Sequence, residues 1–129
     1  MIQGKTIALD VDNTLADTVG VFCKLATVEF GYPIERRMIG SPKIAGSIRA
    51  DPRVIFSILD KIWNDWPRLP PLELDVGSTV EQLRSRENRV IIATSRPERS
   101  IEQVKSWLMN NNVSYDEFRH FNPERRNLR

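Results

Sequence analysis

The chain contains three short segments that fit β-strands, of which the first two are apolar runs. The first covers residues 5–11, and the other two are Val90–Ala93 and Phe118–Phe121. Apolar runs of about four to eight residues, bounded by turn-forming residues, are typical of strands buried in a sheet. We therefore predict a buried strand at each of the first two places and a short third strand at Phe118–Phe121.

Between the first two runs, apolar residues recur at helical spacing. A helix is predicted to begin at a cap formed by Asp17 or Thr18 and to stop at Gly31. Residues 53–66 show the same amphipathic pattern, and prolines follow it directly. Residues 32–52 contain three prolines and are predicted to form a long loop.

A helical pattern also precedes the second strand segment, and another lies between the second and the third. Ser78 and Glu81 have the spacing of a capping box, and Ser95 and Glu98 repeat that spacing before another amphipathic stretch. Alternation of strand and helix implies parallel strands joined by right-handed crossovers. We predict an α/β core built from residues 1–15 and 76–129, interrupted by a small helical insert at 16–75.

Composition narrows the class of protein. The chain has 129 residues, of which 19 are basic and 17 acidic, for a net charge of +2. A nucleic-acid binder usually has a denser basic stripe, so nucleic acid is not the expected partner. The one cysteine, Cys23, cannot form an internal disulfide, and no segment fits a membrane span or a signal peptide. We expect a soluble, cytoplasmic protein that does not bind membranes.

The first apolar run ends in two carboxylates. Asp10 and Asp12 are two residues apart, so on an extended strand both side chains would point the same way. Ligands of open α/β sheets bind at the carboxyl ends of the strands. Carboxylates held together there suit a bound cation or proton transfer. The alternative is an Asp-rich turn, which accounts for Asp12-Asn13 but not for Asp10 within the apolar run.

The second run ends in Thr94, Ser95 and Arg96. Hydroxyl groups and free backbone N–H groups at the start of a helix can bind an anion, and Arg96 is a weaker candidate for the same task. Alternatively, Ser95 is only the N-cap of the following helix and Arg96 lies on the surface.

These two segments resemble the sequence motifs of a known superfamily. Asp10-Val-Asp12-Asn-Thr14-Leu is similar to the first motif, D-x-D-x-T, of the haloacid dehalogenase-like phosphohydrolases, and Thr94-Ser95 after an apolar strand resembles the second. The short insert and the amino-acid sequence around Asp10 look most like those of the 5'(3')-deoxyribonucleotidase group. The resemblance, over about residues 4–122, implies a Rossmann-like parallel sheet with helices on both faces and a helical cap after the first strand.

The resemblance also implies roles for individual residues. Asp10 would be the nucleophile that forms an aspartyl-phosphate, and Asp12 the general acid and then base. A Mg²⁺ ion would be held by the Asp10 side chain and the Asp12 backbone carbonyl. Thr14 would support the turn, and Arg125 or Arg126 could stand in for the basic group that neutralises the phosphate.

One expected feature of the superfamily is missing from the sequence. An acidic pair on a further strand should complete the Mg²⁺ shell, but no aspartate follows Asp116, and Glu124 is the only acid after Phe121. Without that strand, one edge of the first strand would be unpaired. The chain could be a shortened product of a longer gene, a homodimer whose partner covers the open edge, or a degenerate relative.

Two functions therefore compete. The first is a Mg²⁺-dependent phosphatase acting on a small phosphomonoester, with nucleotides among the candidates. The second is a truncated or degenerate protein of the same fold that binds phosphate compounds without turnover. Aromatic residues of the insert could line a substrate pocket, but at helical spacing we interpret them as core, and we interpret His120 as structural. These aromatic residues are Phe22, Phe30, Tyr32, Trp63 and Trp66.

Overall fold

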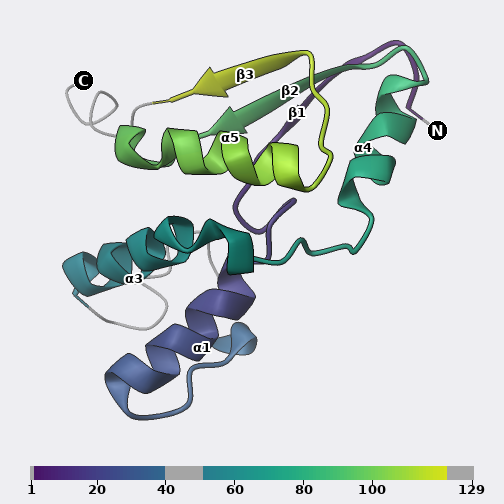
Figure 1. Ribbon diagram of the computed structural model, residues 1–129. Helices are drawn as coiled ribbons and strands as arrows, with labels where there is room; N and C mark the ends of the chain where they lie inside the picture. Colours follow the sequence, from purple (N-terminus) through teal and green to yellow (C-terminus); the bar gives the residue numbers. More distant parts are fainter. Residues whose placement is uncertain (1, 40–50, 122–129) are drawn as a thin grey trace.

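A computed structural model describes residues 2–39 and 51–121 of the chain (Figure 1). This part contains three β-strands, four α-helices and three short 3₁₀ helices. In chain order they are β1 (Thr6–Leu9), α1 (Thr18–Phe30), η1 (Arg36–Met38), α3 (Pro52–Asn64), η2 (Trp66–Arg68), α4 (Val76–Arg84), β2 (Arg89–Thr94), η3 (Glu98–Ser100), α5 (Ile101–Asn110) and β3 (Glu117–His120).

The three strands form one parallel sheet in the order β1-β2-β3. Leu9 pairs with Ile92, and Thr94 pairs with His120, so β2 is the central strand. The predicted parallel α/β arrangement is confirmed, and the sheet with its helices is Rossmann-like. Because the strands are parallel, the carboxyl ends of β1 and β2 lie at the same edge of the sheet.

Strand β1 differs from its prediction. It covers Thr6–Leu9 rather than 5–11, and its residues alternate between exposed and half-buried instead of being buried. The reason is its position, because β1 lies at the end of the described sheet and pairs only with β2 there. The expectation that one edge of the first strand is unpaired thus holds for the described residues, and a partner chain that covers it stays a prediction.

The helices that flank the strands pack against one face of the sheet. Val90 and Ile92 of β2 belong to the hydrophobic core, and Ile91 between them is also buried, whereas Thr6, Ala8 and Arg119 on the neighbouring strands are exposed. Figure 1 shows α4 and α5 on the same side of the strands. In the described residues, the expected helical cover is therefore present on one face.

The helical insert and the sheet share one continuous core. Phe22 of α1 and Trp63 of α3 belong to the same buried cluster as Ile92 and Val104. Trp63 packs edge-on against Trp107 of α5, with ring centroids 6.4 Å apart and planes at 75°. The interpretation of the aromatic residues as core is confirmed except for Tyr32, which is half-exposed. The predicted boundaries of the cap, residues 16–75, remain a prediction.

Helix ends follow the sequence signals in part. Asp17 caps α1 by accepting a hydrogen bond from Gly20 N, and Gly31 ends α1 in the left-handed region at φ 76°. The predicted capping box at Ser78 is wrong, because α4 begins earlier, at Val76, and Ser78 lies inside the helix. Among the described residues, none of the helices has the length and hydropathy of a membrane span.

Candidate functional site

The chain turns sharply directly after β1. The Val11 carbonyl accepts hydrogen bonds from the backbone N–H groups of Thr14, Leu15 and Ala16, at 3.3, 3.0 and 2.9 Å. Asn13 completes the turn in the left-handed region at φ 59°, which asparagine tolerates better than most residues. Thr14 is exposed and supports this turn through its backbone. The turn fixes the backbone on either side of Asp12.

Asp10 is the exposed carboxylate of the site. Its Oδ1 accepts a hydrogen bond from the N–H of Val11 at 2.7 Å. Partial desolvation by the surrounding protein raises the pKa of Asp10 above 3.8, and the nearby charge of Asp12 raises it further, while the Val11 hydrogen bond opposes both. An accessible carboxylate with a perturbed pKa is typical of a functional site.

This perturbation predicts that Asp10 lowers stability at neutral pH. A carboxyl with a raised pKa in the folded state binds more protons there than in the unfolded chain, so stability falls as pH rises from 3.8 through the folded pKa. We expect Asp10→Asn to melt at a higher temperature than wild type at pH 7, with the difference shrinking toward about pH 3. Thermal melts at both pH values test this.

Asp75→Asn provides the control for this experiment. Asp75 is exposed and makes no capping hydrogen bond with its side chain at the start of α4. The same substitution at Asp75 should therefore change the melting temperature little. An Asp10→Asn protein that is less stable than wild type at pH 7 would contradict the prediction.

The carboxylate of Asp12 is held by side chains from three elements. Its Oδ1 accepts hydrogen bonds from Thr18 Oγ1 of α1 at 2.8 Å and from Trp63 Nε1 of α3 at 2.9 Å. Its Oδ2 lies 4.0 Å from Nε of Arg96, which follows β2. Asp12 is thus oriented by both the helical insert and the sheet.

At the end of β2, Thr94 and Ser95 have different surroundings. Thr94 is buried, and its Oγ1 accepts a hydrogen bond from the N–H of Arg96 at 3.2 Å. Ser95 is exposed. The alternative that Ser95 is an N-cap is wrong, because Pro97 precedes the first turn of η3 and no side chain caps it. Of the two hydroxyls, that of Ser95 is the more accessible to a ligand.

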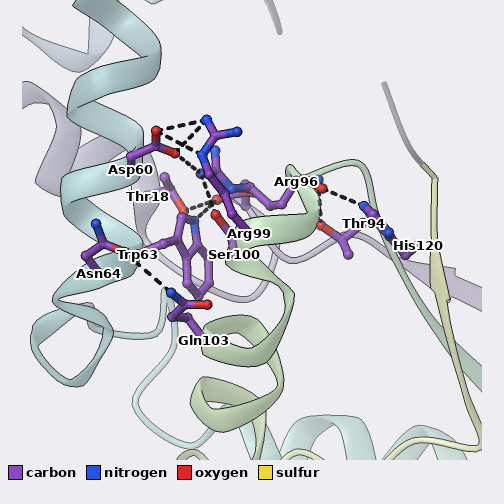
Figure 2. A network of polar contacts seen from close by, with 11 residues as sticks. Thr18, Asp60, Trp63, Asn64, Thr94, Arg96, Arg99, Ser100, Gln103 and His120 are labelled. Atoms are coloured by element: carbon purple, nitrogen blue, oxygen red, sulfur yellow. Dashed lines mark hydrogen bonds and ion pairs between the residues drawn. The ribbon is translucent and has the colours of Figure 1, made fainter. Parts of the chain in front are cut away.

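Arg96 lies in the interior rather than on the surface, with 8% of its side chain exposed. Figure 2 shows it within a polar network that joins α3 to the end of β2. Its Nη2 lies 3.5 Å from Asp60 Oδ1 and 3.4 Å from Ser100 Oγ, while its buried Nε has no hydrogen-bond partner in the structure. Burial lowers the pKa of Arg96, and the charges of Asp12 and Asp60 oppose that effect.

Two further residues complete this network. Arg99 contacts the other side of Asp60, with Nη2 2.9 Å from Oδ2, but its own side chain is 60% exposed. His120 Nε2 lies 2.7 Å from the Arg96 carbonyl oxygen, which agrees with the structural interpretation of His120. Arg96 therefore joins the strand ends to the insert, and its assignment as a phosphate ligand stays a prediction.

The acidic groups available for a metal ion are few. Within residues 2–39 and 51–121, no group of three or more His, Cys, Asp or Glu residues could hold an ion. Asp10 is accessible, whereas the Asp12 carboxylate is engaged by Thr18 and Trp63. Mg²⁺ is often bound by one or two carboxylates together with substrate phosphates and water, and Asp10 fits that mode. Arg125, the predicted basic group, lies outside the described residues.

Sequence reasoning missed three side chains of the site: Thr18, Asp60 and Trp63. The sequence predicted Thr18 only as a helix cap, and Trp63 as a core residue that could alternatively line a substrate pocket. A usable signal was present, because Asp60 and Trp63 are three residues apart and so share one face of α3. A carboxylate and a tryptophan on the inner face of a predicted cap helix indicate polar contacts across the interface.

Comparison with known proteins gives little further information on the function of this site. No protein-family model and no curated protein sequence matches the chain. Among solved structures, the fold is similar to that of a Thermotoga maritima protein assigned as a beta-phosphoglucomutase, with 16% sequence identity and a TM-score of 0.48. The match covers 90% of this chain and 61% of that one. At this level of similarity, the function has to be argued from the residues of this chain.

Proposed function

We propose that the chain is a Mg²⁺-dependent phosphatase that hydrolyses a small phosphomonoester, with nucleotides among the candidate substrates. One observation carries the proposal. Asp10 is an accessible carboxylate at the carboxyl end of β1, and Asp12, two residues on, is oriented by three other side chains. One carboxylate free to attack and one held in a fixed orientation match the two tasks of phosphate-ester hydrolysis.

In the first step, a carboxylate oxygen of Asp10 attacks phosphorus. The bond between phosphorus and the ester oxygen breaks, and the leaving alcohol takes a proton from Asp12. In the second step, Asp12 removes a proton from a water molecule that attacks the aspartyl-phosphate. The bond between phosphorus and the Asp10 oxygen breaks, which releases phosphate and regenerates the Asp10 carboxylate. Asp12 serves as acid first and base second, as a single carboxyl group can.

Phosphate binding is assigned to the end of β2. The exposed hydroxyl of Ser95 supports this assignment, as does the proximity of β1 and β2 at their carboxyl ends. Thr94 contributes by ordering the backbone, because its hydroxyl accepts the N–H of Arg96. Arg96 adds positive charge near Asp12, 4.0 Å from Oδ2.

The proposed Mg²⁺ ion would be held by the Asp10 carboxylate and the Asp12 carbonyl oxygen, together with oxygens of the substrate phosphate. When bound, it supplies positive charge that offsets the negative charge of the phosphate. With so few protein ligands, metal affinity should be low in the absence of substrate.

The proposal is tested by phosphate release from nucleoside monophosphates and from 4-nitrophenyl phosphate, with Mg²⁺ and with a chelator in its place. We expect multiple turnovers with Mg²⁺ and a loss of at least about tenfold on chelation. Release that is unaffected by chelation would rule out the metal dependence, and no release from folded protein would rule out the phosphatase.

The second candidate function is phosphate binding without turnover by a degenerate or truncated chain of the same fold. The observation that favours it is the lack of a three-acid cluster in the described residues. Calorimetric titration with inorganic phosphate distinguishes the two functions. Saturable binding without hydrolysis of any ester supports this alternative, and steady turnover excludes it.

A further inference from the structure

We propose that Trp63 is a positioning residue that determines which oxygen of Asp12 transfers the proton. The inference rests on the proposed phosphatase function and deepens it. The indole N–H of Trp63 and the hydroxyl of Thr18 both donate to Oδ1 of Asp12, at 2.9 and 2.8 Å. The proton that Asp12 gives to the leaving group is therefore carried by Oδ2.

The chemical argument concerns the lone pairs of the carboxyl group. Each carboxylate oxygen has about two acceptor sites, and at Oδ1 two donors occupy them. A proton placed on Oδ1 would displace one of these hydrogen bonds and leave either the indole N–H of Trp63 or the hydroxyl of Thr18, both buried, without this acceptor. Leaving a buried donor unsatisfied costs about 1–3 kcal/mol. Among the described residues no donor is hydrogen-bonded to Oδ2, since Arg96 Nε lies 4.0 Å away and makes no hydrogen bond.

Trp63 is well suited to hold this orientation because it cannot move easily. Its side chain is fully buried, and its ring packs edge-on against Trp107. One turn earlier on α3, Asp60 pairs with Arg96, the cation that faces Oδ2. Helix α3 therefore acts on Oδ1 directly through Trp63 and on the surroundings of Oδ2 through Asp60 and Arg96.

The chain contains a matched control for this role. Trp107 is also fully buried, and its indole N–H also makes one hydrogen bond, of 2.8 Å, but to the backbone carbonyl of Leu69. Trp63→Phe and Trp107→Phe each remove one buried indole N–H from the same core. Only Trp63→Phe removes a donor to Asp12, so the difference between the two variants isolates the positioning role from a loss of packing.

The test compares two substrates with each variant. An alkyl phosphomonoester needs a proton donor for its poor leaving group, whereas 4-nitrophenyl phosphate leaves readily without one. We expect Trp63→Phe to lower kcat on the alkyl ester by about tenfold or more, to lower kcat on the aryl ester much less, and to leave KM nearly unchanged. Trp107→Phe should lower both rates by the same factor.

The contact itself has a readout that does not depend on activity. The three tryptophans, Trp63, Trp66 and Trp107, give three indole N–H signals in a ¹⁵N–¹H correlation spectrum. Comparison with Trp63→Phe assigns the signal of Trp63. In Asp12→Ala, this signal should shift upfield because its acceptor is gone, while the signal of Trp107 should stay in place.

The possible outcomes distinguish failure of the positioning role from failure of the proposed phosphatase function. If Trp63→Phe slows both substrates equally, the positioning role is wrong while the phosphatase stands. An unmoved Trp63 signal in Asp12→Ala overturns the contact on which the inference rests. If wild type hydrolyses neither ester although the signal moves, the proposed function fails and the catalytic role of the contact fails with it.

Discussion

Asp10→Asn is expected to lower phosphate release by about 10³-fold or more, because the amide oxygen of asparagine is a poor nucleophile and cannot form the aspartyl-phosphate. The fold should survive the change, since Asp10 is exposed and its one local contact, from Val11 N, can be made to the amide oxygen. Initial rates with 4-nitrophenyl phosphate and with a nucleoside monophosphate measure the effect.

Asp75→Asn is again the matched control, because it makes the same chemical change at the exposed residue that directly precedes α4. It should retain the wild-type rate on both substrates. Hydrolysis by Asp10→Asn at a rate within about twofold of wild type would exclude Asp10 as the nucleophile. Trapping of labelled phosphate on wild type but not on Asp10→Asn would identify the covalent intermediate directly.

Arg96→Met is expected to destabilise the protein by about 3 kcal/mol. Methionine keeps much of the packing of the arginine stem but removes the charge between Asp12 and Asp60. Losing one partner of a buried ion pair costs about 3–5 kcal/mol because the remaining charge is left uncompensated. The lower end of that range applies here, since the side chains of Asp12 and Asp60 are 27% and 30% exposed. Urea denaturation followed by circular dichroism measures the change.

Arg99→Met provides the comparison. Arg99 pairs with the same carboxylate, Asp60, but its own side chain is 60% exposed. An exposed ion pair contributes about 0–1 kcal/mol, so this variant should remain close to wild type. Equal losses for Arg96→Met and Arg99→Met would show that the burial of Arg96 is not what makes it important.

Much of the secondary structure follows from local patterns. The cap of α1 at Asp17 and its end at Gly31 were predicted because both depend on neighbouring residues only. The start of α4 was not, since Val76 and Gly77 pack into buried positions ahead of the Ser78 signal. Here tertiary packing starts the helix ahead of the local start signal, which sequence propensity alone does not indicate.

The exposure of strands depends on their neighbours. The sequence of β1 is as apolar as that of a buried strand, yet its residues are half-buried or exposed because it has one neighbour in the described sheet. By contrast, the central position of β2 buries Val90 and Ile92 as predicted. An apolar run indicates a strand, but its place in the sheet determines how much of it is buried.

The candidate site was likewise predictable from the sequence only in part. The sequence by itself determined that Asp10 and Asp12 end one strand and Thr94 and Ser95 end the next, because the order of elements in a parallel α/β fold brings these ends together. It could not indicate that Trp63, 51 residues from Asp12, donates to its carboxylate. Only the tertiary structure decided that contact and the buried pairing of Asp60 with Arg96. The physical reason is that periodicity fixes which face of a helix turns inward, while the packing of α3 against α1 and α5 fixes which side chains meet there.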